Sequence, residues 1–545
     1  MSEQHTEDVQ VLVVGGAIVG LSAALFLARK GIRTLVVERQ PSTLRHPRAR
    51  VLNPRTVEIY RQAGLEEALF SELNLSSEMS TKLMVRAETL AGPEFFSTPL
   101  QDEAPELTAD VTPCTWCSID QDKAEGIITE RAAELGARID WATELVALDQ
   151  HADGVSAVLH GPDGAERTVR ADYVIGADGT RSTVRRLLGI PAEGPGTLVN
   201  TVSVVFRADL SEPLRGRDIG LGYLDKPESG TLLIPLDDDR WVFYTPYHPE
   251  QGDRIEDWDE ARCVAAIRAA AGVPELRVEE LEVQIEKTGQ KILGFEIAAQ
   301  LAARYRDGRV FLAGDAAHAT PPTGAFGAST GIQDAHNLAW KLAAVLDRTA
   351  GEALLDSYEA ERRPVAEVTT GYAMAEMQGR SAEGQDEGAL SYASVVLGHR
   401  YTSGAVLAEP GDESAPPAVD PRRLGRPGTR APHLAGRLDG KELSALDLVD
   451  AAPVLLAGPA GAAWEHAAGP TAQRLGIDLE VHRVGGDFAP AAEDATAAWT
   501  ERYGVGADGA VLVRPDGVVA WRATGAADHA QQELERVLGQ VLDRA

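Results

Sequence analysis

Asp315 is the residue whose surroundings in the sequence point most directly to chemistry. It follows an apolar run at residues 310–313 and Gly314, and a loop rich in proline and glycine comes after it. An Asp at the end of a strand, beside glycines that let a ligand approach the backbone, suits a carboxylate that holds a sugar or ribityl hydroxyl. A helical pattern from about Thr330 would aim its free N–H groups at the same ligand and stabilise negative charge there. Residues 309–346 therefore predict half of a cofactor site.

A second candidate site stands near the N-terminus. Residues 11–14 form an apolar run, residues 15–20 a glycine turn and residues 21–30 an amphipathic helical pattern, and a second apolar run ends in Glu38. Glycines at such a turn let the backbone meet a pyrophosphate at the helix N-terminus, and the acid can bind a ribose hydroxyl. Ala17 takes the position of the middle glycine of GxGxxG. The pattern predicts a βαβ unit that binds a dinucleotide.

Polar residues at two further strand ends are candidate ligand contacts. Gln121 stands at the junction of a short strand and a helix, where its side chain could hydrogen-bond a ligand in the cleft. Asp178 and Gly179 end a buried strand, which is where open α/β sheets bind ligands. Arg181 or Arg185, in the turn that follows, could anchor the phosphates of a nicotinamide cofactor.

Two arginines and two cysteines allow both a functional and a structural interpretation. Arg48 and Arg55 bracket an Asn-Pro turn and could neutralise cofactor phosphates or face a cofactor ring, or could simply form a solvated helix start. Cys114 and Cys117 form a C-x-x-C pair, but the first cysteine precedes a strand-like stretch rather than a helix N-terminus. A redox role for this pair is therefore the less favoured interpretation.

The pattern changes between about residues 190 and 300, where alternating or apolar segments are separated by acidic turns. With residues 82–99 these segments predict a mostly antiparallel sheet that forms a second domain over the cofactor, a common place for a substrate pocket. Its aromatic residues could line a binding surface, although core packing is the better-supported role for any single one. These residues are Tyr223, Trp241, Phe243 and Tyr244.

The composition limits the class of partner. The net charge of −31 over 545 residues argues against nucleic acid and against an anionic membrane, because both would repel the protein. Three cysteines give no disulfide framework, and the polar, acidic N-terminus lacks the basic start of a signal peptide. We therefore expect a cytoplasmic protein that acts on a small molecule.

The C-terminal third predicts a separate domain. A helical region runs from Arg348 to Arg380, Pro364 is expected to break or kink it, and Arg380 could meet a phenolate substrate or face solvent. Residues 409–432 form a Pro/Gly-rich linker, and beyond it apolar strands alternate with helical stretches. The last cysteine is Cys263, so this domain has no thiol chemistry.

Four motifs stand in order along the chain: GGAIVG from Gly15 with Glu38, PRA at Pro47, ADG-x-x-S-x-x-R from Ala177 and AGDAAH-x-x-PPTG from Ala313. Together they closely resemble the single-component FAD-dependent aromatic hydroxylases, the flavoprotein monooxygenases of the para-hydroxybenzoate hydroxylase type. Within that group the chain looks most like the enzymes that tailor polycyclic aromatic polyketides, of the aklavinone hydroxylase type. The resemblance covers the whole chain.

The resemblance implies which residues bind FAD. The candidates for catalysis, Arg380 and Tyr223, and those for substrate binding, Tyr223, Trp241 and Phe243, come from the residues themselves. Two departures affect the flavin contact, because Ala325 stands where a second glycine is common and Ser329 where Asn is common. The implied FAD-binding residues are Gly15, Gly16, Ala17, Ile18, Val19, Gly20, Glu38, Arg39, Arg48, Gln121, Leu145, Asp178, Gly179, Asp315, Pro322, Gly324, Gly327, Ala328, Ser329 and Thr330.

The activity that the resemblance implies is hydroxylation of a polycyclic aromatic polyketide of the anthracycline, angucycline or tetracycline type in antibiotic biosynthesis. FAD, reduced by NADPH or NADH, would form a flavin 4a-hydroperoxide with O₂, and no metal is required. The same intermediate could instead carry out a Baeyer-Villiger insertion, a ring opening or a rearrangement, since fold does not fix the reaction. A low-turnover antibiotic-binding flavoprotein is the alternative from another class.

The implied fold is α/β, with a Rossmann-type FAD-binding domain (GR2-like), an inserted, mostly antiparallel β-sheet substrate domain and a C-terminal thioredoxin-like domain. The C-terminal domain is interpreted as structural, for packing or for contacts in a homodimer. The expected divisions are residues 1–78, 112–190 and 291–408 for the FAD-binding domain with its helical region, 79–111 and 191–290 for the substrate domain, 409–432 for the linker and 433–545 for the thioredoxin-like domain.

Overall fold

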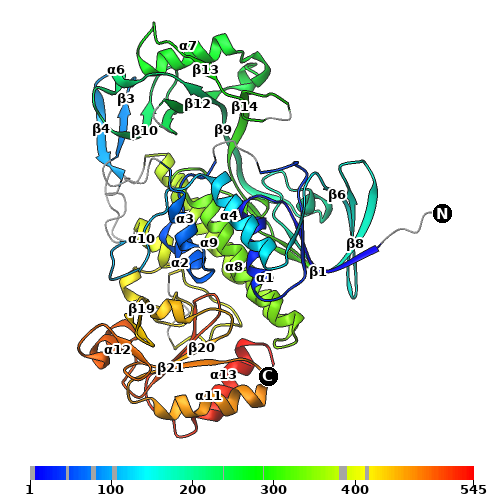
Figure 1. The fold of residues 1–545 in the computed structure, drawn as a ribbon, viewed down its shortest axis with the longest axis vertical. Helices are drawn as coiled ribbons and strands as arrows, with labels where there is room; N and C mark the ends of the chain where they lie inside the picture. Colours follow the sequence, from blue (N-terminus) through cyan, green and yellow to red (C-terminus); the bar gives the residue numbers. More distant parts are fainter. Residues whose placement is uncertain are drawn as a thin grey trace, which may run out of the picture.

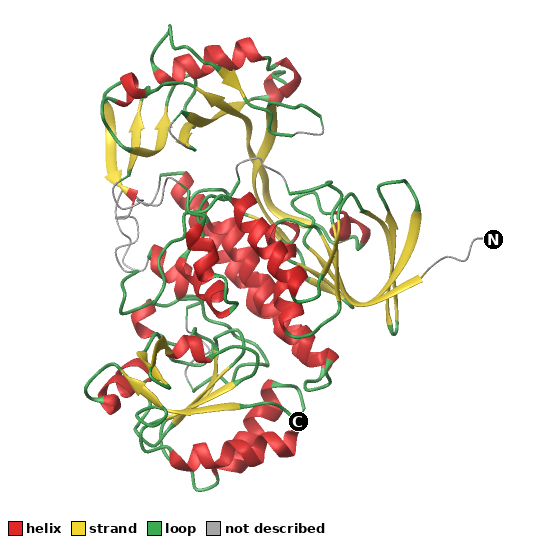
Figure 2. Ribbon diagram, viewed as in Figure 1, coloured by secondary structure: helices red, strands yellow, loops and turns green. Residues whose placement is uncertain are grey.

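The computed structural model describes residues 6–43, 48–74, 82–100, 107–236, 239–285, 288–379, 390–410 and 416–544. Figure 1 shows three parts along the long axis: a sheet with long helices in the middle, a second sheet at one end and the C-terminal domain at the other. Figure 2 shows the longest helices gathered in the middle part, with strands on either side of them.

The first sheet has the order β15-β16-β8-β1-β2-β5, and β7 pairs with both β8 and β6. Neighbours from β16 to β5 are parallel, and residues 11–14 of β1 are at most 5% exposed. Helices cover both faces of such a sheet, so its central strands are apolar throughout rather than alternating. The strands are β1 (Thr6–Val14), β2 (Thr34–Val37), β5 (Arg138–Asp140), β6 (Glu144–His151), β7 (Gly154–His160), β8 (Glu166–Gly176), β15 (Arg306–Asp307) and β16 (Val310–Leu312).

The helices of the middle part pack closely because α1 presents small residues to its neighbours. Gly20, Ser22, Ala23 and Ala24 of α1 are buried, and α1 packs against both α4 and α8. The helices are α1 (Ile18–Arg29), α2 (Pro54–Gln62), α3 (Glu66–Ser71), α4 (Gln121–Glu134), α5 (Thr183–Leu187), α8 (Phe326–Leu346), α9 (Ser357–Met377) and α10 (Tyr392–Leu397).

The second sheet has the order β17-β14-β9-β12-β11-β10-β3-β4, and β13 pairs with β9. Its pairs are antiparallel except β10 with β3, so the predicted mostly antiparallel sheet is confirmed. Helix α7 covers the face away from the middle part (Figure 1). The elements are β3 (Leu83–Ala87), β4 (Glu94–Pro99), β9 (Ala192–Arg207), β10 (Ile219–Leu224), β11 (Thr231–Pro235), β12 (Arg240–Tyr247), β13 (Glu280–Leu281), β14 (Ile292–Ala302), β17 (His318–Ala319), α6 (Ser211–Leu214) and α7 (Glu260–Ala271).

The C-terminal domain has the thioredoxin-like arrangement that the sequence predicts. Its main sheet has the order β21-β20-β23-β24, with β20 parallel to β21 and antiparallel to β23. Helices α11 and α13 pack together against this sheet. The elements are β18 (Ala435–Leu438), β19 (Lys441–Ser444), β20 (Val454–Ala457), β21 (Glu480–Arg483), β22 (Phe488–Pro490), β23 (Ala510–Val513), β24 (Val519–Ala523), α11 (Ala462–Leu475), α12 (Ala495–Tyr503) and α13 (Ala530–Val541).

Two helices differ from their predicted bounds. Helix α8 begins at Phe326, four residues before the predicted start at Thr330, because the Phe326 ring packs into an aromatic cluster with Tyr372 and Tyr392. Helix α9 continues through Pro364, which was predicted to break or kink it, and ends at Met377. Tertiary packing outweighs local preference at both places, since glycines near Phe326 and a proline in α9 each disfavour a helix.

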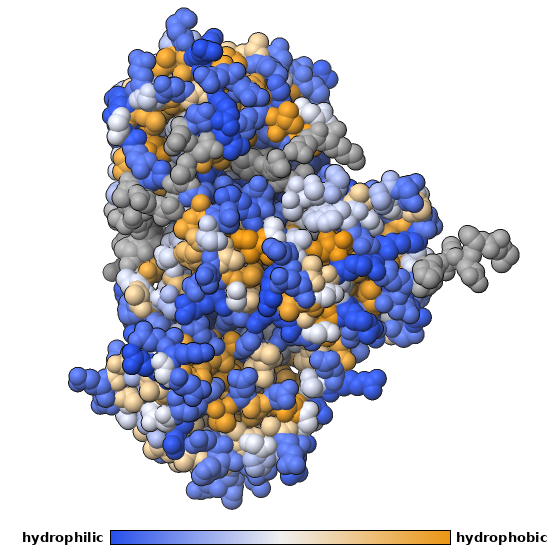
Figure 3. All heavy atoms as spheres, viewed as in Figure 1, coloured by the Kyte–Doolittle hydropathy of each residue, from blue (hydrophilic) through white to orange (hydrophobic). Residues whose placement is uncertain are grey.

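The outer surface is mostly hydrophilic on the face drawn in Figure 3, in keeping with the acidic composition. Among the described residues, none of the helices has the length and apolar character that a bilayer span requires. The same residues contain no cluster of three or more His, Cys, Asp or Glu side chains suited to hold a metal ion.

Candidate cofactor and substrate site

The parallel strands of the first sheet bring their carboxyl ends to one edge. Val14 at the end of β1 pairs with Val37 of β2 and Gly176 of β8, and Gly176 pairs with Leu312 of β16. The residues that follow these strands therefore lie side by side, and they carry the polar groups that the sequence singled out. They are Gly15, Glu38, Asp178 and Asp315.

The glycine turn after β1 is required by sterics. Gly15 has φ +111°, and a Cβ there would lie 2.3 Å from the Ala177 carbonyl oxygen. A Cβ on Gly20 would lie 1.9 Å from the Gly15 carbonyl oxygen, so α1 can approach β1 only with glycine at this position. Ala17 has φ −90° and ψ −178°, which is ordinary extended backbone. Alanine at the middle-glycine position therefore introduces no backbone strain.

Glu38 follows β2, as predicted, and its carboxylate lies against the glycine turn. Oε2 accepts a hydrogen bond from the Gly16 backbone N–H at 2.7 Å, and Oε1 accepts one from the Gln40 backbone N–H at 2.8 Å. The acid and the turn are thus held together as one unit. The neighbouring Arg39 is exposed.

Glu125 is a residue of this edge that the sequence analysis missed. Its Oε1 accepts from the Ile18 backbone N–H, the first of α1, at 2.9 Å and from Gln121 Nε2 at 2.7 Å. The side chain is buried, and desolvation raises its pKa to about 7. The four-residue spacing from Gln121 to Glu125, which puts both on one helix face, was the available signal. Gln121 therefore orients this carboxyl group through its amide.

Asp315 lies where the chain crosses from the first sheet, at β16, to the second, at β17. The residue is exposed to solvent, yet the protein around it desolvates the carboxyl group enough to raise its pKa. The carboxyl group is therefore accessible to solvent but surrounded closely enough by protein to be partly desolvated. The charge of Arg48 opposes this shift and also opposes the raised pKa of Glu125, so the exposed Arg48 acts on both carboxyl groups.

The start of α8 leaves backbone donors open beside Asp315. Ala325, the N-cap, has φ +55° and ψ +36° and provides no side-chain cap. Among the described residues, no atom would lie within 4 Å of a Cβ on Gly327, so this side of the first turn is open with respect to that part of the chain. The hydroxyl of Tyr392 donates to the Gly324 carbonyl oxygen at 2.7 Å and holds the loop from α10. Such an uncapped helix start favours negative charge on a ligand.

The other predicted residues of this loop differ in how accessible they are. Pro322 is exposed, and Gly324 and Ala328 are half-buried. Ser329, at the end of the first turn of α8, and Thr330, at the start of the second, are buried. Ser329 Oγ accepts from the Asn53 backbone N–H at 3.3 Å, and the Thr330 carbonyl accepts from Arg362 at 3.2 Å. Through these two hydrogen bonds, Ser329 and Thr330 join α8 to the loop before α2 and to α9.

Asp178 caps a helix at the end of β8. Its Oδ2 accepts from the backbone N–H groups of Thr183 at 2.6 Å and Val184 at 3.1 Å, at the start of α5. Arg185 donates to the carbonyl oxygens of Thr180 and Ala316, both at 2.7 Å, so it ties this turn to the Asp315 segment. Arg181 and Gly179 remain accessible, and cofactor binding by this turn stays a prediction.

Arg55 does not have the cofactor role that was considered for it. It is buried, donates to Glu58 Oε2 at 2.9 Å and donates to the Asp516 carbonyl oxygen of the C-terminal domain at 2.7 Å. Its Asp516 partner is 461 residues away in sequence and could not be found from local spacing. The cysteine pair is likewise unsuited to redox chemistry, because burial raises the pKa of both Cys114 and Cys117 and disfavours their thiolates.

Strand alternation divides the predicted substrate residues between two faces of the second sheet. Trp241 and Phe243 are buried in the core that α7 covers, so the prediction that their side chains line a substrate surface does not hold. Tyr244 lies on the other face and meets Phe295 edge-on, with ring centroids 5.7 Å apart. Tyr223 shares that face, since it pairs with Leu232, which pairs with Tyr244.

The face that carries Tyr223 and Tyr244 is turned toward the middle part. Arg50, from the loop before α2, donates to the Pro235 carbonyl oxygen at 2.5 Å, and its charge acts on the Tyr244 hydroxyl. Leu145, a predicted cofactor contact, is buried in the core of the middle part. Arg380, the other predicted catalytic residue, lies outside the described residues.

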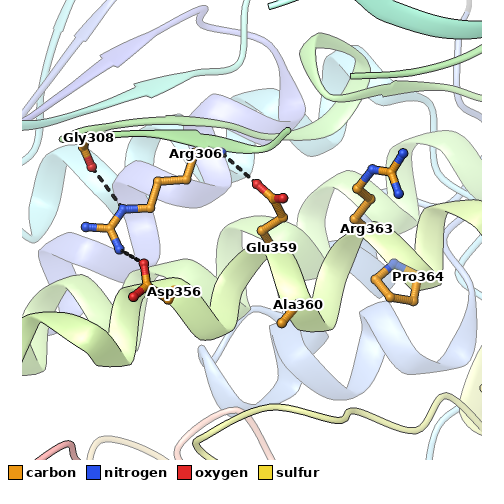
Figure 4. A pocket seen from close by; sticks show the side chains of 7 residues that line it. All are labelled: Arg306, Gly308, Asp356, Glu359, Ala360, Arg363 and Pro364. Atoms are coloured by element: carbon orange, nitrogen blue, oxygen red, sulfur yellow. Dashed lines mark hydrogen bonds and ion pairs between the residues drawn. The ribbon is translucent and has the colours of Figure 1, made fainter. Parts of the chain in front are cut away.

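The pocket in Figure 4, with a volume of about 700 Å³, lies away from these groups. It is lined by Arg306, Gly308 and residues of α9, and Arg306 is paired with Asp356 within it. Gly308 precedes β16 whereas Asp315 follows it, so the pocket opens at the opposite edge of the sheet. Arg363 pairs with Glu193 and Glu367 outside the pocket, and Glu359 accepts from the backbone N–H groups of Tyr305 and Arg306. The pocket is not part of the proposed cofactor site.

A parallel sheet with a glycine turn, an acid after the second strand and an exposed Asp at the sheet crossing defines a dinucleotide-binding enzyme of the flavoprotein class. Residues 8–372 match the family described as FAD binding domain, and residues 425–545 match the family described as aromatic-ring hydroxylase, C-terminal. The chain therefore belongs to the FAD-binding aromatic-ring hydroxylases, and it is an FAD-dependent monooxygenase.

Individual relatives agree with this assignment over the full length. An aklavinone 12-hydroxylase of Streptomyces purpurascens is 42% identical, with 99% of this chain and 100% of that protein covered. A tetracenomycin A2 monooxygenase-dioxygenase of Streptomyces glaucescens is 41% identical, with 99% and 98% covered. The crystal structure of a ternary complex of aklavinone-11 hydroxylase with FAD and aklavinone has a TM-score of 0.90 at 41% identity, with 99% of both chains covered.

Proposed function

We propose that this protein hydroxylates a polycyclic aromatic polyketide in antibiotic biosynthesis, with FAD as cofactor and NADPH or NADH as reductant. The observation that carries the proposal is the position of Asp315, an exposed carboxyl group at the crossing between the sheet that binds a dinucleotide and the sheet that carries Tyr223 and Tyr244. The full-length likeness to hydroxylases of aklavinone and tetracenomycin supports the substrate class.

The residues at the sheet edge fit FAD. Gly15 and Gly20 keep the backbone close to β1, where a pyrophosphate could approach the start of α1. Glu38 is placed to accept from a ribose hydroxyl, Arg48 to neutralise phosphate charge and Asp315 to accept from a ribityl hydroxyl. The open space at Gly327 leaves room for a ring at the start of α8.

In this proposal, the start of α8 supplies most of the electrostatic stabilisation of the bound cofactor. Its uncapped N–H groups favour negative charge on the reduced ring, in a cleft where such an interaction is stronger than in water. The sheet face with Tyr223 and Tyr244 binds the aromatic substrate and excludes water from the reacting centre. Tyr223 remains the described candidate for a contact with a phenol.

The chemistry that bound FAD supplies is reduction by NAD(P)H, activation of O₂ and transfer of one oxygen atom to an electron-rich ring. The overall reaction consumes substrate, O₂, NAD(P)H and a proton and gives the hydroxylated product, water and NAD(P)⁺. The protein's part is to orient the ring over the cofactor and to protect the site from solvent.

The proposal is tested by an aerobic assay of the FAD-loaded protein with NADPH, NADH and a panel of tetracyclic phenols. We expect NAD(P)H oxidation to rise with a suitable phenol and to yield a product heavier by one oxygen atom, about 16 mass units. NMR of the product separates hydroxylation from insertion of oxygen into a ring. Tight phenol binding without stimulated NAD(P)H oxidation would instead support the antibiotic-binding alternative.

The substrate face is tested by a matched pair of variants. Tyr223→Phe removes one hydroxyl from the proposed face, and we expect about a tenfold loss in kcat/KM for the phenolic substrate, the effect of one lost hydrogen bond of about 1.4 kcal/mol. Trp241→Phe alters the opposite face beneath α7 and should leave kcat/KM within about twofold. Equal losses in both variants would contradict the assignment of faces.

A further inference from the structure

Two neighbouring residues of α9, Glu361 and Arg362, contact different parts of the molecule. Glu361 is 1% exposed, and its two oxygens accept from Arg514 Nη1 at 2.6 Å and Nη2 at 2.8 Å. Arg514 follows β23, so this bidentate ion pair joins α9 to the C-terminal domain. Lys341 of α8 donates to the same carboxylate at 2.7 Å. The charges are buried, and each has a partner of opposite sign.

Arg362 carries the connection from α9 to the first turns of α8. Its Nε donates to Asp334 Oδ1 at 2.7 Å, and its Nη2 donates to the Thr330 carbonyl oxygen at 3.2 Å. Its Nη1 donates to the Tyr401 hydroxyl at 2.7 Å. One guanidinium group therefore fixes the side chain of Asp334 and the backbone of α8 relative to each other.

Asp334 also hydrogen-bonds to the segment that contains Asp315. Its Oδ2 accepts from the Gly314 backbone N–H at 3.1 Å and from His318 Nε2 at 2.7 Å. Burial alone would raise the pKa of Asp334, but the charges of His318 and Arg362 hold it below the usual value, so the group stays ionised. The two residues that Asp334 binds stand on either side of Asp315.

Close packing restricts Gly314 independently of its hydrogen bond to Asp334. Its φ of +58° is a conformation that favours glycine, and a Cβ there would lie 2.9 Å from Val19. Gly331 of α8 packs on it so closely that a Cβ on Gly331 would lie 2.9 Å from the Gly314 Cα. Asp334 therefore supplies the polar contact of an interface that is otherwise made by glycine packing.

We propose that Asp334 is a positioning residue of the cofactor site, which sets the Asp315 carboxylate through Gly314 and His318 and is itself held from the C-terminal domain through Arg514, Glu361 and Arg362. This inference rests on the proposed placement of FAD at Asp315. It gives the cysteine-free C-terminal domain a task at the cofactor site that involves no thiol.

The test compares Asp334→Asn with Glu58→Gln. An Asn amide can present its oxygen either to Arg362 or to Gly314 and His318, so its NH₂ group must face a donor on the other side. Glu58 is a matched control, because it is 2% exposed and pairs with Arg55 and with Arg430 near the same domain boundary. In the part of the chain that the structure describes, the Glu58 carboxylate contacts Arg55, Thr112 and Arg430, all of which lie outside the Gly314 segment.

We expect Asp334→Asn to weaken FAD binding at least tenfold and to change the visible circular dichroism of the bound flavin. Glu58→Gln should leave both within twofold, although unfolding measurements should show both variants destabilised. Equal effects of the two variants on FAD affinity and on the flavin spectrum would overturn the proposal, since domain contact in general would then be sufficient. If Asp334→Asn does not fold, Arg362→Lys keeps the buried charge and should weaken FAD binding about threefold; an unchanged affinity and spectrum would also overturn it.

Asp315→Asn separates failure of this inference from failure of the FAD placement. Weaker FAD binding in Asp315→Asn together with normal binding in Asp334→Asn would leave the placement standing and reject the positioning role. Unchanged FAD binding in Asp315→Asn would reject the placement, and the inference with it.

Discussion

The amino-terminal turns of α1 and α8 lie at the same edge of the first sheet but are built differently. Helix α1 starts from a turn in which Gly15 and Gly20 are required by contacts with nearby backbone, and its first N–H is bound by Glu125. Helix α8 starts from Ala325 in the left-handed conformation, has no side-chain cap and faces open space at Gly327.

The difference shows two ways of preparing a backbone to meet an anionic ligand. The start of α1 is closed by local sterics, so its shape is fixed whether or not a ligand is present. The start of α8 is held by remote contacts, from Tyr392 of α10 and from Arg362 of α9, and keeps its donors open. We expect substitutions at the first to affect folding, and substitutions at the second to affect FAD.

Gly20→Ala should have the largest effect. Its Cβ would lie 1.9 Å from the Gly15 carbonyl oxygen, so α1 must move away from β1. We expect a loss of more than about 4 kcal/mol in the free energy of unfolding, in the range of severe core disruption. Urea unfolding followed by far-UV circular dichroism measures it.

Gly327→Ala provides the contrast at α8. A Cβ there meets no atom of the described residues within 4 Å, and alanine favours a helix over glycine by about 1 kcal/mol. We expect the apoprotein to be as stable as wild type or more stable, while FAD binding weakens because the methyl group occupies the cofactor's space. A destabilised apoprotein with normal FAD affinity would contradict the comparison.

Glu125→Gln should change how the stability of the apoprotein depends on pH. The folded pKa of Glu125 is about 7 and its unfolded value is about 4.3, so its stabilising contribution is complete below pH ~4 and is lost as the pH rises through about 7. Glutamine keeps the acceptor for the Ile18 N–H but does not titrate. The variant should match wild type near pH 4 and be more stable by about 3 kcal/mol at pH 8.

Urea unfolding at pH 4, 6 and 8 tests this, with Glu134→Gln as control. Glu134 lies on the same helix, but its side chain is 55% exposed and pairs with Arg131. Its substitution should leave the pH dependence unchanged. A constant difference between Glu125→Gln and wild type at all three pH values would show that the Glu125 carboxyl group is not desolvated in the fold.

Tyr392→Phe should have a smaller effect, confined to α8. It removes the hydrogen bond to the Gly324 carbonyl oxygen but keeps the ring stacked on Phe326. One hydrogen bond contributes about 1 kcal/mol, so FAD affinity should fall about fivefold. Fluorescence titration with FAD measures the change. An unaltered affinity would mean that ring packing alone holds the loop.

Ala325→Gly should have the smallest effect. Left-handed backbone costs a non-glycine residue about 1 kcal/mol, and the greater freedom of glycine in the unfolded chain offsets part of the gain. We expect a stabilisation of about 0.5 kcal/mol, seen as a higher thermal midpoint. Ala325→Val should lower the midpoint, because a β-branched residue tolerates this conformation poorly. Equal midpoints in both variants would show that the loop relaxes.

The same comparison explains what the sequence could predict. The turn after β1, Glu38 and the βαβ unit that β1 and β2 form follow from local spacing, because the glycine and acid requirements of such a unit arise within about 30 residues. In the C-terminal domain the apolar runs predicted strands that alternate with helices, whereas the thioredoxin-like arrangement was implied only by the family resemblance.

The rest depended on contacts that no local pattern records. The glycines around Phe326 argued for a loop, whereas its packing with Tyr372 and Tyr392 starts the helix there. Alternation in β12 separates Phe243 from Tyr244, but only the position of α7 decides which of them is covered. The sequence left Arg55 as either a cofactor contact or a solvated helix start, because its actual partner, Asp516, belongs to another domain.

The ion pair between Glu361 and Arg514 also bears on how this chain could be recombined with its relatives. A chimera that takes its C-terminal domain from another protein would leave Glu361 with Lys341 as its nearest compensating charge if the donor lacks an arginine at position 514. Removal of one partner from a buried ion pair commonly costs about 3–5 kcal/mol, and Lys341 would offset only part of this cost. A crossover point before α8 would keep α8 and α9 in the same parent sequence as the C-terminal domain that they contact. We therefore expect it to yield folded hybrids more often than a crossover point between α10 and β18.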